Sequence, residues 1–194
     1  MNSSKEITLN TLTIALGANI PSYQGPPCST LIAVRPLLEK EICEWVKSSL
    51  KENVTIDEIS FQLKWQWSPL FESEALGGPP NQPNFINAVV IIYGPLTESM
   101  NPSESAALDL LTRTRKLEKL FGRERNKDSI RWGPRSLDID LLAWGNLQIR
   151  NQYLTLPHPR ILERNFVLMP LATALNLKTG NSPLQLSPQK NWAE

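Results

Sequence analysis

The sequence contains few of the residues that build redox and metal centres. Its 194 residues include two cysteines and one histidine. Cys28 and Cys43 have neither the spacing of a metal site nor that of a disulfide framework, so we interpret them as packing residues in a reducing cytosol. A single histidine, His158, does not by itself indicate a metal site or a catalytic triad.

Long apolar runs and a strong net charge are also missing. No stretch is long enough to cross a bilayer, and residues 1–11 are too polar for a signal peptide. A net charge of +1 gives the chain no broad electrostatic field, which argues against an extended nucleic-acid surface. We therefore expect a soluble, cytoplasmic protein that binds small molecules, with no nucleic-acid or membrane partner.

Two glycine-rich phosphate-binding patterns are absent as well. The sequence has neither Gly-x-x-x-x-Gly-Lys-Ser/Thr nor Gly-x-Gly-x-x-Gly, which argues against a P-loop kinase and a dinucleotide-binding fold. Any phosphate group must then be held by side chains.

The most informative stretch is Arg131–Leu142, a basic loop that turns at Gly133-Pro134 and continues into an alternating apolar segment. Because side chains alternate across a strand, Asp138 and Asp140 point to one face, about 6.5 Å apart. Two neighbouring like charges are unfavourable unless a cation neutralises them, and carboxylate oxygens suit Mg²⁺ or Ca²⁺. The loop before them is rich in residues that suit a phosphate: Arg123, Arg125, Lys127, Arg131 and Arg135.

Carboxylates beside arginines are the combination that a nucleotide-dependent transferase needs. The alternative is an ordinary solvated strand face whose charges the arginines balance. The crowding of five basic residues around Trp132 favours the functional interpretation.

The periodicity of apolar residues predicts alternating strands and helices. We expect a helix over Thr30–Leu50, interrupted at Pro36, and a helix that starts from a cap at Asn101 with a capping-box Glu104 and stops at Gly122. Gly145-Asn146 predicts a tight hairpin turn. The expected strands are Leu12–Leu16, Phe61–Trp67, Phe85–Tyr93 and the segment with Asp138 and Asp140.

This order indicates a single α+β domain over residues 1–194, with its core at about 12–175. It is the βαββαβ order of ferredoxin-like folds, here with an added β-hairpin and a carboxyl-terminal helical segment. RNA-recognition modules share that order, but their aromatic signature is missing from the strand Phe85–Tyr93.

A second polar site follows the hairpin. His158 lies between two prolines, and Arg164 and Phe166 come shortly after it. These neighbours favour a binding role over a purely structural one for the histidine. Asn87, near the head of a buried strand, needs a hydrogen-bond partner, which is either nearby backbone or a ligand.

With both sites in view, the chain resembles the 6-hydroxymethyl-7,8-dihydropterin pyrophosphokinase family of folate biosynthesis. The resemblance extends from Leu12 to about Leu175 and appears in family order. The block Arg131–Asp140 is close to the family signature, and the supporting blocks are Leu16–Asn19, Asn81–Asn87, Gly122-Arg123 with Arg125, and Leu156–His158 with Arg164.

The resemblance implies an enzyme that moves the β,γ-diphosphate of ATP onto the pterin's hydroxymethyl oxygen and releases AMP. It implies two Mg²⁺ ions held by Asp138 and Asp140, with Arg123 and Arg135 completing the catalytic set. The runner-up is a non-catalytic ferredoxin-like module that retains nucleotide or RNA. The paired carboxylates favour the enzyme, for which we expect a monomer.

The resemblance also implies two binding sets. The residues matched to ATP are Arg115, Glu118, Arg125, Trp132, Arg135, Leu141, Thr155, His158 and Arg164. Those matched to the pterin are Ser73, Glu74, Ala75, Leu76, Phe85, Asn87, Trp132, Asp138 and Phe166. The loop Arg123–Trp132 is expected to close over the site and to be poorly ordered without nucleotide.

Overall fold

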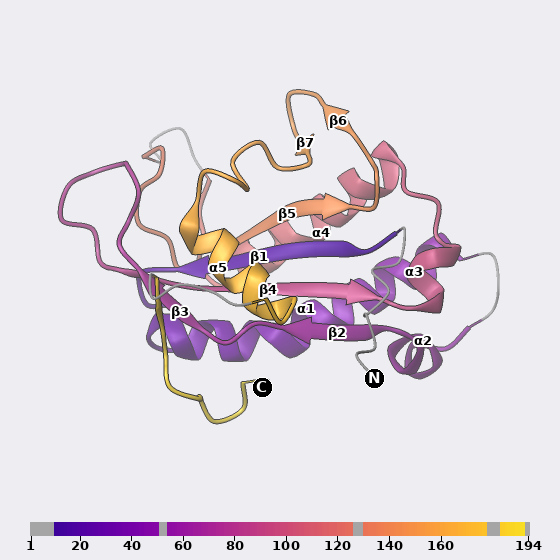
Figure 1. Ribbon diagram of the computed structural model, residues 1–194, viewed down its shortest axis with the longest axis horizontal. Helices are drawn as coiled ribbons and strands as arrows, with labels where there is room; N and C mark the ends of the chain where they lie inside the picture. The colour runs from indigo at the N-terminus through magenta and orange to yellow at the C-terminus, as the bar shows by residue number, and fades with distance from the viewer. Residues whose placement is uncertain (1–9, 51–53, 126–129, 178–182, 193–194) are drawn as a thin grey trace.

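The protein is described by a computed structural model that covers residues 10–50, 54–125, 130–177 and 183–192. One antiparallel sheet of six strands carries the fold, in the order β5-β1-β4-β3-β8, with β2 also paired to β4 (Figure 1). The strands are β1 Leu12–Ala18, β2 Lys64–Trp67, β3 Phe71–Ser73, β4 Phe85–Tyr93, β5 Asp138–Trp144 and β8 Leu184–Gln185.

Helices cover both faces of the sheet. The long helices α1 (Pro27–Ser49) and α4 (Glu104–Leu120) lie on one face, and the short α2 (Ile56–Gln62) and α3 (Pro95–Ser99) lie where β2 starts and β4 ends (Figure 1). Helix α5 (Asn165–Ala174) lies across the other face. Alternate residues of each central strand therefore enter different cores, as Val90 packs toward α1 and Val89 toward α5. None of the helices in the described ranges combines the length and apolarity that crossing a bilayer requires.

The three central strands confirm the expected ones. Seven consecutive residues of β4 are buried, because β4 is covered on both faces and paired on both edges. The helical segment expected near the carboxyl end is also present, as α5.

Helix α1 differs from its prediction in two ways. It begins at Pro27 rather than Thr30, and it continues through Pro36 without ending. Proline suits the first helical turn, because the amide it lacks has no partner there. Pro36 is tolerated because Leu31, Val34 and Leu38 on the same helix are fully buried against the core.

The predicted strand Phe61–Trp67 is wrong over its first residues. Phe61 belongs to α2, which Thr55 and Glu58 start with a capping box, and its side chain is 92% exposed. The alternation of aromatic and polar residues extends across the boundary between α2 and β2, and the local cap decides where the helix forms.

The expected cap of the second long helix was also misplaced. The residue that caps α4 is Ser103, whose hydroxyl accepts a hydrogen bond from the Ala106 amide at 3.3 Å. Glu104 is consequently the first helical residue and cannot serve in a capping box. The predicted stop is confirmed, since Gly122 adopts a left-handed φ of 86°.

The turn predicted at Gly145-Asn146 is present, but the strand pairing expected around it is not found in the described residues. The chain turns at Gly145, but β6 (Ile149–Arg150) pairs with β7 (Thr155–Leu156) and not with β5. The reason lies in the following turn, where the Asn151 side chain accepts hydrogen bonds from the amides of Tyr153 and Leu154, both at 2.8 Å.

Candidate active site

The floor of the candidate site is formed by small residues of the central strand β1. Gly17 lies opposite Asn87 of β4 on one side and Asp138 of β5 on the other. Ala15 lies opposite Asp140 in the next row. A Cβ atom on Gly17 would come within 3.3 Å of the Asn87 Oδ1 atom. The small residues Gly17 and Ala15 thus form a shallow floor between the polar side chains of the two adjacent strands.

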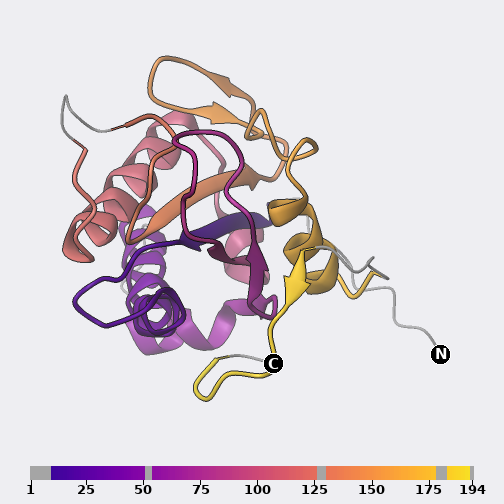
Figure 2. The ribbon, with the colours of Figure 1, turned by 90° about the vertical axis from the view of Figure 1, so that its left-hand side faces the viewer.

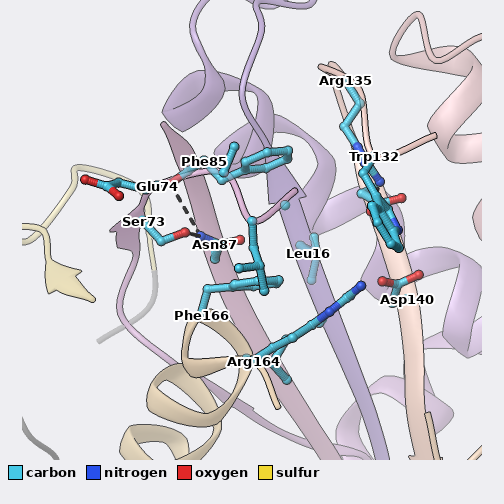
Figure 3. A pocket seen from close by; sticks show the side chains of 16 residues that line it. Leu16, Ser73, Glu74, Phe85, Asn87, Trp132, Arg135, Asp140, Arg164 and Phe166 are labelled. Carbon is cyan, nitrogen blue, oxygen red and sulfur yellow. Dashed lines mark hydrogen bonds and ion pairs between the residues drawn. The ribbon is translucent and has the colours of Figure 1, made fainter. Parts of the chain in front are cut away.

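The walls of this pocket come from segments far apart in the sequence, as Figure 3 shows. The structure brings together the predicted residues Ser73, Glu74, Ala75, Leu76, Phe85, Asn87, Trp132, Arg135, Asp138, Asp140, Arg164 and Phe166. Sequence reasoning missed the lining residues Ala15, Leu16, Gly17 and Val167, although Leu16 and Gly17 lie in a block that carries the family resemblance. The side chain of Glu74 points away from the pocket centre.

Asp138 and Asp140 both line the pocket, as strand alternation predicts. Burial, together with the neighbouring Asp138 and Glu118 carboxylates, raises the pKa of Asp140 to about 7. A divalent cation would relieve this repulsion, so the pair fits Mg²⁺. In the described ranges, no group of three or more His, Cys, Asp or Glu side chains could hold a metal. Further ligands would therefore be phosphate or water oxygens.

Three guanidinium groups surround Asp138 in the structure. The nearest nitrogen atoms of Arg135, Arg123 and Arg125 lie 2.7, 3.2 and 3.7 Å from its carboxylate oxygens. Arg123 and Arg135 are mostly buried, and burial lowers the pKa of Arg123 while Asp138 opposes that shift. The three arginines thus neutralise the Asp138 carboxylate.

Glu118 connects this cluster to the sheet. Its carboxylate accepts hydrogen bonds from Arg125 at 2.7 to 3.0 Å and from the Ile139 amide at 2.9 Å. Burial, together with Asp138, raises the pKa of this carboxyl. Glu118 is only 1% exposed, and the hydrogen bonds of its carboxylate fix the positions of Arg125 and of the start of β5.

The opposite side of the pocket is aromatic. Phe85 of β4 and Phe166 of α5 face the pocket, with Trp132 on its other side (Figure 3). The Arg135 guanidinium lies 5.6 Å from the Phe85 ring centre. Asn87 donates a hydrogen bond to the Ser73 hydroxyl at 2.9 Å. Asn87 also donates to the Phe85 carbonyl at 3.4 Å, so the nearby backbone that one of the two sequence-based alternatives named is a partner as well.

Trp132 joins two loops. Its carbonyl accepts a hydrogen bond from the Gln82 side chain, which also donates to the Gly77 carbonyl. A Cβ atom on Gly78 would lie 2.3 Å from the Trp132 carbonyl oxygen, so only glycine permits this approach. The loops are therefore in direct contact. The predicted disorder of Arg123–Trp132 falls partly on residues 126–129, outside the described ranges, and stays a prediction.

The segment with the lone histidine lies beside β5. The His158 amide donates to the Leu142 carbonyl at 2.7 Å. Burial and the nearby Arg164 guanidinium lower the pKa of His158, so its ring is neutral at neutral pH. Arg164 reaches across the pocket toward Asp140 (Figure 3), and its buried Nε has no hydrogen-bond partner within the described chain. An anion would satisfy that donor.

Several predicted nucleotide residues lie outside the pocket lining. Leu141 is only 3% exposed, so a contact with nucleotide would have to use its backbone on the edge strand β5. The predicted catalytic residue Arg123 also lies outside the lining. The other predicted nucleotide residues outside it are Arg115, Glu118, Arg125, Thr155 and His158. Their assignment to ATP stays a prediction.

Known proteins resemble this chain along most of its length. The model of the 7,8-dihydro-6-hydroxymethylpterin-pyrophosphokinase family matches residues 13–176. A 2-amino-4-hydroxy-6-hydroxymethyldihydropteridine pyrophosphokinase from Synechocystis is 37% identical over 126 residues, covering 63% of this chain and 57% of that protein. The enzyme of the same name from Haemophilus influenzae is 36% identical over 128 residues, covering 66% and 72%.

A folate synthesis bifunctional protein of Arabidopsis thaliana is 42% identical over 108 residues, which cover 56% of this chain and 20% of that protein. The match also spans less than two thirds of the Synechocystis relative. The family model nevertheless matches well over half of this chain and includes every element that forms the pocket. The chain therefore belongs to the 7,8-dihydro-6-hydroxymethylpterin-pyrophosphokinase family.

Proposed function

We propose that the protein transfers the β,γ-diphosphate of ATP to the hydroxymethyl group of 6-hydroxymethyl-7,8-dihydropterin, which gives the pterin diphosphate and AMP. The observation that carries this proposal is one pocket in which paired carboxylates face arginines on one side and aromatic rings on the other. The names of the family and of the relatives support the same reaction.

The aromatic side of the pocket suits the pterin. A flat, polar bicycle is favoured by ring stacking and by hydrogen bonds along its edge. Phe85 and Phe166 supply the rings, and Asn87 supplies an amide whose orientation the Ser73 hydroxyl fixes. The lining backbone from Ser73 to Leu76 and the ring of Trp132 complete the enclosure.

The acidic side suits Mg²⁺. Asp138 and Asp140 would hold two ions, which polarise the attacking hydroxyl and neutralise phosphate charge. Arg123 and Arg135 lie within ion-pair distance of Asp138, which supports a role for their guanidinium groups in binding the migrating diphosphate. In such transfers, positioning and charge neutralisation supply most of the catalysis.

The nucleotide would lie along the outer edge of β5. Arg164 offers an unpaired guanidinium Nε, and the neutral His158 ring offers a hydrogen-bonding group. We assign Arg115, Glu118, Arg125, Trp132, Arg135, Leu141 and Thr155 to the same nucleotide on the family resemblance.

The arrangement of strands supports a ferredoxin-like core in a single domain. Without β8 and β2, the sheet order β5-β1-β4-β3 equals 4-1-3-2 when the strands are counted along the chain, and every pairing is antiparallel. Helices α1 and α4 lie on one face of the sheet. In the sequence, α1 follows β1, and α4 lies between β4 and β5.

The test is a mixture of the protein with Mg²⁺, ATP and the hydroxymethyl dihydropterin, in which AMP is measured. We expect AMP release by the wild-type protein, and a loss of about a hundredfold or more for Asp140→Ala, because one metal ligand is gone. Asp109→Asn is the matched control, since that carboxylate lies on α4 and pairs with Arg113. Retention of ATP without AMP release would indicate the binding module, and near-normal release by Asp140→Ala would contradict the metal role.

A further inference from the structure

The backbone of Trp132 is held in an unfavourable conformation. Its φ of 58° lies in the left-handed region, which bulky residues with a Cβ atom rarely adopt. Such a conformation persists only where surrounding contacts fix it, and it concentrates at ligand sites. The contacts that fix Trp132 therefore bear on the shape of the pocket it lines.

Some of these contacts come from the loop with Gly77 and Gly78. The Trp132 ring packs over Gly77, where an added Cβ atom would lie 3.0 Å from ring atom Cε3. Gln82 holds the Trp132 carbonyl. These contacts join two loops that both lie over the pocket, so they do not by themselves fix the loops to the sheet.

Asn19, directly after β1, holds both loops through hydrogen bonds with the Arg135 backbone and the Pro83 carbonyl. The Trp132 ring itself is contacted from a third segment. The Cζ atom of Arg160 lies 4.7 Å from the centre of the Trp132 ring, close to the 4.6 Å of the adjacent Arg131. Both distances are within the range of a cation–π interaction. Arg131 precedes Trp132 in the same loop and moves with it, whereas Arg160 belongs to the segment beside β5.

Hydrogen bonds connect the backbone of Arg160 to β5 through His158. Its amide donates to the His158 ring at 3.3 Å, and the amide of His158 donates to the Leu142 carbonyl in β5. Its guanidinium is 4.0 Å from Glu163, whose side chain is 69% exposed, so that ion pair is weak. The guanidinium is consequently directed mainly to the indole ring.

We propose that Arg160 is a positioning residue for the pterin: its guanidinium holds the Trp132 indole against the pocket and so connects that wall to β5. This inference rests on the proposed function for its substrate, but it assigns a role to a residue that lies outside the pocket lining. Trp132 lines the pocket assigned to the pterin and is assigned to the nucleotide only on the family resemblance, so pterin affinity should depend on Arg160 more strongly than ATP affinity does.

The experiment compares Arg160→Gln and Arg160→Lys with the wild-type enzyme. Arg160→Gln should raise the KM for the pterin about two- to tenfold while the KM for ATP changes less than about twofold, because the substitution removes the cation that connects the indole to the segment beside β5 and leaves Arg131 in place. Arg160→Lys should recover part of the effect. Glu163→Gln is the matched control, since it alters the neighbouring exposed charge and leaves the cation in place.

A double-mutant cycle with Trp132→Leu gives the decisive readout. Once the indole is absent, Arg160→Gln should have no further effect on pterin affinity. If Arg160 acted instead through general stability or phosphate binding, the substitution would still weaken pterin binding in the Trp132→Leu background. Independent effects of the two substitutions, or an equal rise in the KM for ATP, would overturn the proposal. Direct pterin titration by its own fluorescence keeps this test separate from turnover, so a wild-type protein that binds pterin without releasing AMP would refute only the proposed reaction.

Discussion

The shape of the pocket floor depends on Gly17, because glycine has no side chain to fill it. Gly17 lies between Asn87 and Asp138 in the register of the sheet, and its Cβ position faces Phe85 at 3.7 Å. The sequence places Gly17 in a recognisable block, but only the pairing of three strands reveals it as the floor of the pocket. The same limit applies to Arg160 and Gln82, whose contacts join residues 28 and 50 positions apart, respectively.

We predict that Gly17→Leu weakens pterin binding by about tenfold or more, because the side chain would occupy the floor beside Asn87 and Phe85. Gly17→Ala should have a smaller effect, since its Cβ meets only the Asn87 Oδ1 atom closely, at 3.3 Å. The measurement is pterin titration of both variants, with ATP affinity as the control. Equal pterin affinity in the leucine variant would show that the ligand does not lie on this floor.

Strands and helices were predictable where a single periodicity covered the whole element. The central strands β1, β4 and β5 and the helices α1 and α4 have such patterns. Strands β3 and β8 were not predicted, because each has two or three residues and forms by pairing with a distant partner. Figure 2 shows β8, in yellow, after α5 and at the edge of the sheet. The Asp138 and Asp140 pair, in contrast, needed only the alternation within one strand.

The segment around β8 packs against β3, the strand that ends at the pocket residue Ser73. Trp192 is 8% exposed, packs against Trp67 with ring centres 5.2 Å apart, and donates a hydrogen bond to the Ser68 carbonyl at 2.8 Å. Leu186 donates to the Leu70 carbonyl, also at 2.8 Å. Leu70 directly precedes β3, whose last residue, Ser73, lines the pocket.

We predict that Trp192→Ala lowers the free energy of unfolding by roughly 3 to 5 kcal/mol, because the substitution leaves a cavity beside Trp67 and an unpaired carbonyl at Ser68. Urea denaturation measures the change. Leu184→Ala is the control from the same segment, since Leu184 is 62% exposed and should cost less than about 0.5 kcal/mol. Similar losses for both variants would mean that the tail as a whole, rather than the tryptophan, provides the stability.

The molecule as a whole concentrates its unfavourable electrostatics on one face of the sheet. Helices α1 and α4 cover the apolar face, while the face under α5 carries Asp138, Asp140 and the arginines. Such a site lowers the stability of the protein in exchange for ligand binding. The composition could not reveal this, because the net charge of the chain is only +1.

The stability of the metal-free protein should therefore depend on pH. Asp140 keeps its proton in the folded state up to about pH 7, whereas in the unfolded chain it ionises near its ordinary value of 3.8. Between these values the folded state binds the additional proton, so the free energy of unfolding falls as the pH rises. We predict that Asp140→Asn removes roughly 1 to 3 kcal/mol of this decline.

Thermal unfolding of both proteins in the presence of a chelator, at pH values on both sides of this window, measures the difference. The wild-type protein should lose more stability than Asp140→Asn as the pH rises through about 7. Parallel pH profiles would show that Asp140 ionises normally in the folded protein.

The ring of guanidinium groups around Asp138 also affects the order in which ligands can enter. A magnesium ion arriving alone would have to displace Arg135 and Arg123 from the carboxylate, and would leave those cations with no anion to receive them. A nucleotide that carries its own magnesium supplies both partners in one exchange. If the pair binds magnesium as proposed, we therefore expect the network of ion pairs to disfavour free metal and to favour the metal–nucleotide complex.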